Sequence, residues 1–258
     1  MNHSDRHKSF YENIDRDKQY TVEKKADNHP FYALLVTFIK KYNLKNKKCL
    51  EIGSSKGLFQ DLVIDYSGVD IAKNLSKYYH KPFFPVSGPI LPFPDDYFDA
   101  IFTYAVHEHI PEVETACEEI IRVLKPGGVC LFAPAWHTRS WFAQGYAVRP
   151  YSNLSLREKL IKLSIPFRDF FPMRYSLIFL RRFFNLLMYI SVPQDTPLRY
   201  KRLSANYEKF WQSDSDACNS LDPFDLVLWF KSRGIICHGY NSMASTFIIK
   251  TYAIEIEK

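Results

Sequence analysis

The chain has 258 residues, of which 47% are hydrophobic and 24% charged, and its formal net charge is +6. This length is ample for one folded core with an added element. The N-terminal residues lack the apolar core of a signal peptide, and no uninterrupted apolar stretch could span a bilayer, so we expect a cytoplasmic protein. The five cysteines have neither metal-ligand nor disulfide spacing and predict reduced core residues.

The first element with a clear pattern is an amphipathic helix over 31–42, which follows a charged and aromatic N-terminal segment, 1–28. An apolar strand, 48–52, then enters a bend rich in glycine and serine, and the spacing of 58–63 predicts a helix. Small residues in such a bend let a ligand lie against the backbone and the helix N-terminus. Glu51 at the strand end suits a cationic or hydroxyl-bearing ligand better than a diphosphate.

A second strand, 66–71, carries Asp70 nineteen residues after Glu51. An acid about 20 residues past a glycine-rich turn binds ribose hydroxyls in nucleotide-binding folds. The alternative is a loop aspartate that caps the next helix.

Strands and helices continue to alternate, which predicts a mostly parallel sheet covered on both faces, with ligands at the carboxyl ends of its strands. We therefore expect the glycine bend, Asp70, Tyr104 and 134–136 at one edge. The remaining predicted elements are a strand over 98–104, a helix over 113–124 ended by 125–128, a strand over 129–134, a helix that starts with Asp222 as N-cap and Pro223, and strands over 235–240 and 246–256.

The order and spacing of three segments, 49–57, 68–70 and 91–128, resemble the class I methyltransferases that use S-adenosylmethionine (SAM). The resemblance covers roughly 46–136 and 222–256. It implies a Rossmann-like, doubly wound α/β fold of seven mostly parallel strands with an antiparallel last strand. It also implies SAM as the cofactor and a core made of 29–136 and 221–258. Relatives often close a segment like 1–28 over the cofactor as a lid, with Tyr11 and Tyr20 as its candidate contacts here, and a flexible N-terminal segment is the alternative.

The resemblance implies that Asp70 binds the ribose of SAM. Ser55 replaces the middle glycine of the family motif, which fits if that position needs no positive φ. Ser87 stands where many relatives place an acid near the adenine amino group, which leaves the adenine to backbone and apolar contacts. The expected cofactor-binding residues are Glu51, Gly53, Ser54, Ser55, Gly57, Asp70, Ile71, Ser87, Leu91 and Tyr104.

The sequence after the fourth strand, 104–107, lacks the signatures of amino-methylating nucleic-acid enzymes, of cytosine C5 enzymes and of metal-dependent catechol enzymes. We therefore expect no metal and an oxygen acceptor on a small molecule, a glycan or a lipid-linked saccharide. Two alternatives remain, namely a methyltransferase that acts on RNA or protein, and a non-catalytic SAM-fold interaction protein.

Three histidines, His107, His109 and His137, are candidate general bases, because neutral imidazole is available near pH 7. His109 matches a histidine common among relatives with very different acceptors, which favours a structural or pocket-shaping role. His137 follows the fifth strand at the expected pocket mouth. A reaction without an essential base is the alternative.

The insertion at 137–220 is where acceptor choice is expected, and 138–212 hold 13 basic against four acidic residues. Within it, 173–192 predict a helix on which Arg174, Arg181 and Asn185 share one face beside a wide apolar arc. Such a helix can lie on an anionic membrane surface or grip a lipid-linked substrate, which would place the protein peripherally at a membrane. The alternatives are a lid helix buried on the core and a homodimer helix. A nucleic-acid partner is least favoured.

The polar stretch 211–220 ends the insertion. Asp214 and Asp216 resemble half a calcium loop, but the glycine and closing glutamate are missing, so we expect no ion there. We expect these two aspartates, Asn219 and Trp136 to line the acceptor site and bind sugar-like hydroxyls. A capping turn is the alternative.

Overall fold

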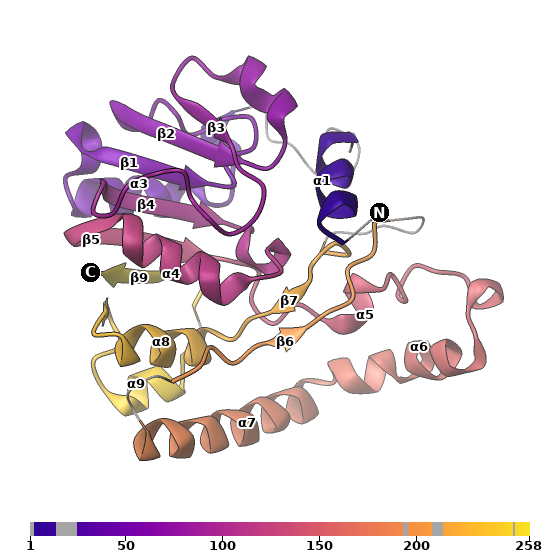
Figure 1. Ribbon diagram of the computed structural model, residues 1–258. Coiled ribbons are helices and arrows are strands. Elements are labelled where there is room, and N and C mark those ends of the chain that lie inside the picture. Colours follow the sequence, from indigo (N-terminus) through magenta and orange to yellow (C-terminus); the bar gives the residue numbers. More distant parts are fainter. Residues whose placement is uncertain (1–2, 14–24, 193–195, 208–213, 250) are drawn as a thin grey trace.

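The computed structural model describes residues 3–13, 25–192, 196–207, 214–249 and 251–258. In these stretches the chain builds a seven-stranded sheet in the order β3-β2-β1-β4-β5-β9-β8 (Figure 1). Strands β1 to β5 pair in parallel, whereas β9 pairs antiparallel with both β5 and β8. The predicted fold class, with its antiparallel last strand, is confirmed. The strands are β1 (Lys48–Ile52), β2 (Asp65–Asp70), β3 (Phe83–Pro85), β4 (Phe98–Tyr104), β5 (Leu124–Ala133), β8 (Ile236–Cys237) and β9 (Ile254–Glu257).

Alternating side chains of the central strands feed two hydrophobic clusters, because successive residues of a strand point to opposite faces of the sheet. In β1, Leu50 and Ile52 belong to one cluster and Cys49 to the other. The first cluster includes the buried faces of α4 (Val113–Val123) and α8 (Pro223–Ser232). The second includes α3 (Tyr32–Lys41). Both faces of the sheet are therefore covered, as a mostly parallel sheet requires.

The predicted start of α8 is confirmed in detail. The Asp222 side chain accepts a hydrogen bond of 2.9 Å from the backbone N–H of Phe224, and Pro223 occupies the first turn. The other helices are α1 (His3–Asn13), α5 (Ser140–Ala143), α6 (Leu156–Asp169), α7 (Phe171–Ser191) and α9 (Met243–Phe247), and a small ribbon pairs β6 (Lys201–Arg202) with β7 (Asn219–Ser220).

Three predicted elements are wrong. The stretch 58–63 forms successive turns rather than a helix, because positive φ angles at Ser55 and Gly57 interrupt the helical path. The stretch 246–256 begins inside α9, whose start is capped by Ser242, and β9 begins only at residue 254. The predicted helix does end just before 125–128, at Val123, although these four residues lie within β5. The short β8 also ends well before residue 240.

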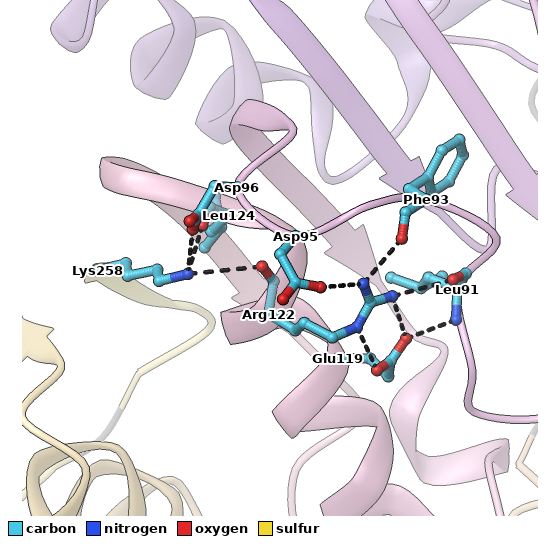
Figure 2. A network of polar contacts seen from close by, with 8 residues as sticks. All are labelled: Leu91, Phe93, Asp95, Asp96, Glu119, Arg122, Leu124 and Lys258. Atoms are coloured by element: carbon cyan, nitrogen blue, oxygen red, sulfur yellow. Dashed lines mark hydrogen bonds and ion pairs between the residues drawn. The ribbon is translucent and has the colours of Figure 1, made fainter.

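A network centred on Arg122 of α4 fixes the loop after β3 (Figure 2). Its guanidinium forms an ion pair with Glu119 and donates to the carbonyl oxygens of Leu91 and Phe93, at 3.1 and 2.8 Å. The Glu119 carboxylate in turn accepts a 2.8 Å hydrogen bond from the backbone N–H of Leu91. Because both main-chain groups of Leu91 are held, the loop that carries this predicted cofactor residue has a defined position.

Helices α6 and α7 form a helical arm, 156–191, which runs along the lower edge of the molecule in Figure 1. The polar stripe of α7 faces α8, where Arg181 and Arg182 pair with Asp222 and the Asn185 amide donates to Asp225 at 2.6 Å. The apolar arc consequently points away from the core, and Leu177 and Phe184 are 63% and 62% exposed. The predicted helix is present, but its basic stripe is an internal contact.

In the parts of the chain that the structure describes, no helix combines the length and the apolar character that crossing a membrane requires.

Candidate cofactor and acceptor site

The strand order changes direction between β1 and β4. From β1 the chain proceeds outward to β2 and β3, whereas β4 leads in the opposite direction to β5. This change of direction lies at the carboxyl edge of the sheet, where open α/β sheets bind ligands, and we call the region around the loops after β1 and β4 the crevice. Residues 53–57 follow β1, and 105–109 follow β4. The two loops that the sequence marked as functional thus lie at the same edge.

The carboxylate of Asp70 organises the turn after β1. It accepts hydrogen bonds of 3.0 Å from the backbone N–H groups of Ser55 and Ala72. Asp70 therefore stands at the crevice as a positioned, half-buried acid. Ser55 adopts φ 47°, so the condition under which serine would fit this position without strain is not met. A residue with a Cβ pays roughly 1 kcal/mol for this left-handed conformation.

At Gly53 the loop after β1 packs closely against the loop after β4. This glycine has φ +72°, and a Cβ built on it would lie 2.0 Å from Cγ2 of Val106, in the loop after β4. Only glycine permits this approach. Gly57 is similarly close to Tyr79, whose hydroxyl donates to the Ser54 Oγ at 2.7 Å. These glycines serve close packing between segments that surround the crevice.

Glu51 lies buried at the end of β1 and accepts a hydrogen bond from the Tyr66 hydroxyl. Burial raises the pKa of Glu51 to about 8, and the nearby Asp70 carboxylate adds to the rise although the Tyr66 hydrogen bond opposes it. Glu51 therefore holds a proton near neutral pH. A cationic group placed beside it would favour its ionised form, in keeping with the cationic ligand that the sequence predicts for this position.

The other predicted cofactor residues differ in exposure. Ile71 is half-buried and Ser87 is exposed, while Leu91 is buried in the hydrophobic core. Tyr104 is half-buried and stacks on Phe31 with ring centroids 5.1 Å apart. These side chains come from the loops after β2 and β3 and from the end of β4, all on the carboxyl side of the sheet.

Two of the three candidate bases are poor proton acceptors. His107 is buried against Phe132, and burial lowers its pKa to about 3. Burial also lowers the pKa of His137 to about 4, which the Asp222 carboxylate opposes and neighbouring arginines reinforce. His137 faces Asp222, with Nδ1 and Oδ2 4.0 Å apart, and so belongs to the α7–α8 contact. Both imidazoles are neutral at pH 7.

His109 instead lies among carboxylates. Its Nδ1 is 3.4 Å from Asp216 Oδ2, and its Nε2 is 3.6 Å from Glu108 Oε1. Burial lowers the pKa of His109, but Asp216, Glu108 and Asp214 outweigh this effect and raise it overall. We call Glu108, His109, Asp214 and Asp216 the acid–histidine cluster. It joins the loop after β4 to the loop before β7.

The backbone holds these two loops together. The N–H of Cys218 donates to the carbonyl oxygen of Glu108 at 2.8 Å, and the Asn219 amide donates to the carbonyl oxygen of Ile110. The Trp136 indole donates to the carbonyl oxygen of Tyr252 at 3.0 Å. Asp214, Asp216 and Asn219 thus lie beside the end of β4, whereas Trp136 is anchored to the segment before β9.

Helix α1 stands beyond the arrowheads of the parallel strands in Figure 1 and bridges the crevice. The Tyr11 hydroxyl donates to Asp216. The carbonyl oxygen of the adjacent Glu12 accepts a 3.0 Å hydrogen bond from the Asn74 amide, which ties the last turn of α1 to the segment after β2. That the N-terminal segment acts as a lid stays a prediction. Tyr20 lies outside the described residues.

Sequence reasoning missed Glu108, Tyr66 and Tyr79. Glu108 stands between His107 and His109, and that His-Glu-His pattern was the available signal. The two tyrosines look like ordinary strand and loop residues, because their roles depend on neighbours from other strands.

The comparisons with known proteins concern the sheet-forming part of the chain. Residues 50–132 match a family model described as a methyltransferase domain. A stretch of 79 residues, 31% of this chain, is 34% identical to a sterol 24-C-methyltransferase of Gibberella zeae, and this chain spans only 18% of that relative. Among solved structures, the YcgJ protein of Bacillus subtilis is 25% identical, covers 52% of this chain and 67% of its own, and has a TM-score of 0.39. A putative S-adenosyl-L-methionine-dependent methyltransferase of Methanococcus maripaludis is 18% identical, covers 75% and 86%, and has a TM-score of 0.39.

Proposed function

Because residues 50–132 are a methyltransferase domain of the class that uses SAM, as the sequence predicted, we propose that the protein methylates a hydroxyl of a lipid-linked acceptor at an anionic membrane surface. The observation that carries the acceptor class is the exposed apolar arc of the helical arm. The proposal of SAM as the cofactor and the proposal of a lipid-linked acceptor rest on different residues, so the two are tested separately.

The crevice residues fit SAM. The positioned carboxylate of Asp70 would bind the ribose hydroxyls, and buried Glu51 would meet the ammonium group. SAM supplies an electrophilic methyl group on its sulfonium, so the protein has to align an oxygen nucleophile and exclude water. Helix α1, tied to both sides of the crevice by Tyr11 and Asn74, is the element that would exclude water.

The helical arm supports a lipid-linked acceptor. A monomeric protein seldom leaves so large an apolar face uncovered, and such faces mark membrane or protein contacts. Basic residues of the same arm, among them Arg157, Lys159 and Arg168, would meet anionic lipid headgroups. The sterol methyltransferase that resembles part of this chain acts, by its name, on a lipid. The exposed apolar side chains of the arm include Leu156, Leu160, Leu163, Phe167, Leu177, Phe179, Leu180, Phe184, Met188 and Ile190.

Calorimetric titration with SAM and with S-adenosylhomocysteine tests the cofactor site. We expect binding of both, weakened at least tenfold by Asp70→Asn and unchanged by the control Asp61→Asn, whose side chain is exposed. We also expect the affinity for SAM to rise from pH 6 to pH 8, because Glu51 must lose its proton to meet a cation. Failure of the wild-type protein to bind either compound would refute the function.

Flotation with phosphatidylglycerol and phosphatidylcholine vesicles tests the membrane contact. We expect binding to the anionic vesicles only, and loss of binding in the double variant Leu177→Asp, Phe184→Asp. The matched control is Ile64→Asp, which changes an equally exposed apolar residue of the methyltransferase domain. The proposed membrane contact would be contradicted if the wild-type protein did not bind vesicles and light scattering showed a dimer that the double variant dissociates. Salt-sensitive binding to RNA instead of vesicles would contradict it as well.

A further inference from the structure

The acid–histidine cluster brings three carboxylates close to a single imidazole. Glu108 and Asp216 are both 0% exposed, and Asp214 is half-buried. His109 supplies at most one positive charge against three negative ones. An ionised carboxylate without a compensating charge is costly to bury, so a cluster of this composition requires added protons or a cation.

Glu108 is the most informative member of the cluster. Among the described residues, neither of its carboxylate oxygens has a hydrogen-bond partner, although the side chain is fully buried. Native proteins rarely leave such an acceptor unsatisfied, and a bound ion is one of the few physical explanations. Its contact with His109 Nε2, at 3.6 Å, is longer than a hydrogen bond.

The geometry is that of a metal-binding site before the ligand atoms close on the ion. One ligand atom each from Glu108, His109 and Asp214 lies within 4.8 Å of the other two. Two ligands at about 2.1 Å from one ion are at most about 4.2 Å apart. Small movements of these side chains would therefore bring all three atoms within bonding distance of a common centre.

We propose that Glu108, His109 and Asp214 bind a divalent metal ion. Carboxylate oxygens combined with an imidazole nitrogen suit Mn²⁺, Fe²⁺ or Zn²⁺. Asp216 lies beside His109 and is held by the Tyr11 hydroxyl, so it orients the imidazole from outside the ligand set. This differs from the sequence expectation of no metal, which considered Asp214 and Asp216 without Glu108.

The cluster follows β4 at the edge of the crevice, beneath α1. A cation there would polarise a hydroxyl that reached it and lower the pKa of that hydroxyl. This catalytic part of the inference rests on the proposed function, whereas metal binding does not. The test is therefore made without SAM or acceptor.

The experiment titrates the chelator-treated full chain with MnCl₂ and follows the electron paramagnetic resonance signal of free Mn²⁺. We expect one Mn²⁺ per chain, displaced by Zn²⁺, and a rise in Tm on loading because the ion binds the folded state. Glu108→Gln and Asp214→Asn should each weaken Mn²⁺ binding at least tenfold. The control Glu118→Gln changes a half-exposed acid of neighbouring α4 and should bind Mn²⁺ normally.

Circular dichroism and SAM titration show whether each variant is folded. Glu108→Gln replaces a buried carboxylate by a neutral amide of the same shape, so we expect a folded protein. Absence of stoichiometric Mn²⁺ and Zn²⁺ binding by the wild-type chain would overturn the proposal and favour a proton shared between Glu108 and His109. Equal Mn²⁺ affinity of the wild type, Glu108→Gln and Asp214→Asn would also overturn it. If the wild-type chain bound Mn²⁺ but not SAM, the proposed function would be refuted and the metal proposal would stand.

Discussion

The substitution Glu51→Gln offers a test of the electrostatics at the crevice. Glu51 is buried and has a pKa of about 8 in the folded chain, against an ordinary value of 4.5. The folded state therefore binds more protons than the unfolded state between these values. Because the folded pKa is raised, the free energy of unfolding falls as the pH rises through this window.

The size of the effect follows from the shift in pKa. A rise from 4.5 to about 8 corresponds, at about 1.4 kcal/mol for each unit, to a loss of at most about 5 kcal/mol. Between pH 5 and pH 8 about 3.5 kcal/mol of this loss is expected. Glutamine retains an oxygen that can accept from the Tyr66 hydroxyl, but it does not ionise. The variant should match the wild type near pH 5 and be more stable than the wild type at pH 8.

Urea unfolding of both proteins at pH 5, 6, 7 and 8 measures this difference. Asp225, whose pKa burial raises to about 7, adds a similar pH dependence to both proteins and cancels in the comparison. Asp225→Asn is a useful second reference, because this substitution should remove the pH dependence of stability that Asp225 contributes and leave the part that Glu51 contributes. A difference between wild type and Glu51→Gln that stays constant from pH 5 to pH 8 would refute the argument that Glu51 is protonated in the fold.

Three further predictions each concern one contact, namely an ion pair, a packing contact and a hydrogen bond. Arg182→Met removes the 2.8 Å ion pair to the buried carboxylate at the N-cap of α8, which Arg181 still contacts, and should lower the free energy of unfolding by about 1–3 kcal/mol, whereas an unchanged free energy of unfolding in urea would be inconsistent with a buried pair. Gly53→Ala places a Cβ 2.0 Å from Val106 and should cost about 1–3 kcal/mol or more, measured by thermal unfolding; an unchanged Tm would contradict the close approach. Tyr11→Phe removes the hydrogen bond to Asp216 and should speed proteolysis of the N-terminal segment several-fold while the core stays intact; equal rates would mean that this contact does not hold α1.

Several features followed from the sequence because they are encoded locally. The apolar runs of β1 and β4 are typical of strands buried on both faces of a sheet, and the Asp-Pro pair favours the helix start that α8 has. The spacing from the glycine turn to Asp70 reflects one strand-to-strand step, so the methyltransferase fold and its cofactor could be predicted. Local signals failed at 58–63, because an apolar pattern does not show the left-handed φ angles of Ser55 and Gly57 just before this stretch, and the chain forms turns there instead of a helix.

The tertiary structure decided what depends on contacts between distant segments. Sequence spacing showed that Arg181 and Asn185 share a helix face, but only the position of α8 turned that face inward and left the apolar arc exposed. Likewise, Glu108 and Asp214 are over 100 residues apart, and the backbone bonds between their loops bring them together. A carboxylate's chemistry depends on the charges and solvent around it, and those are set by whichever segments the fold places beside it.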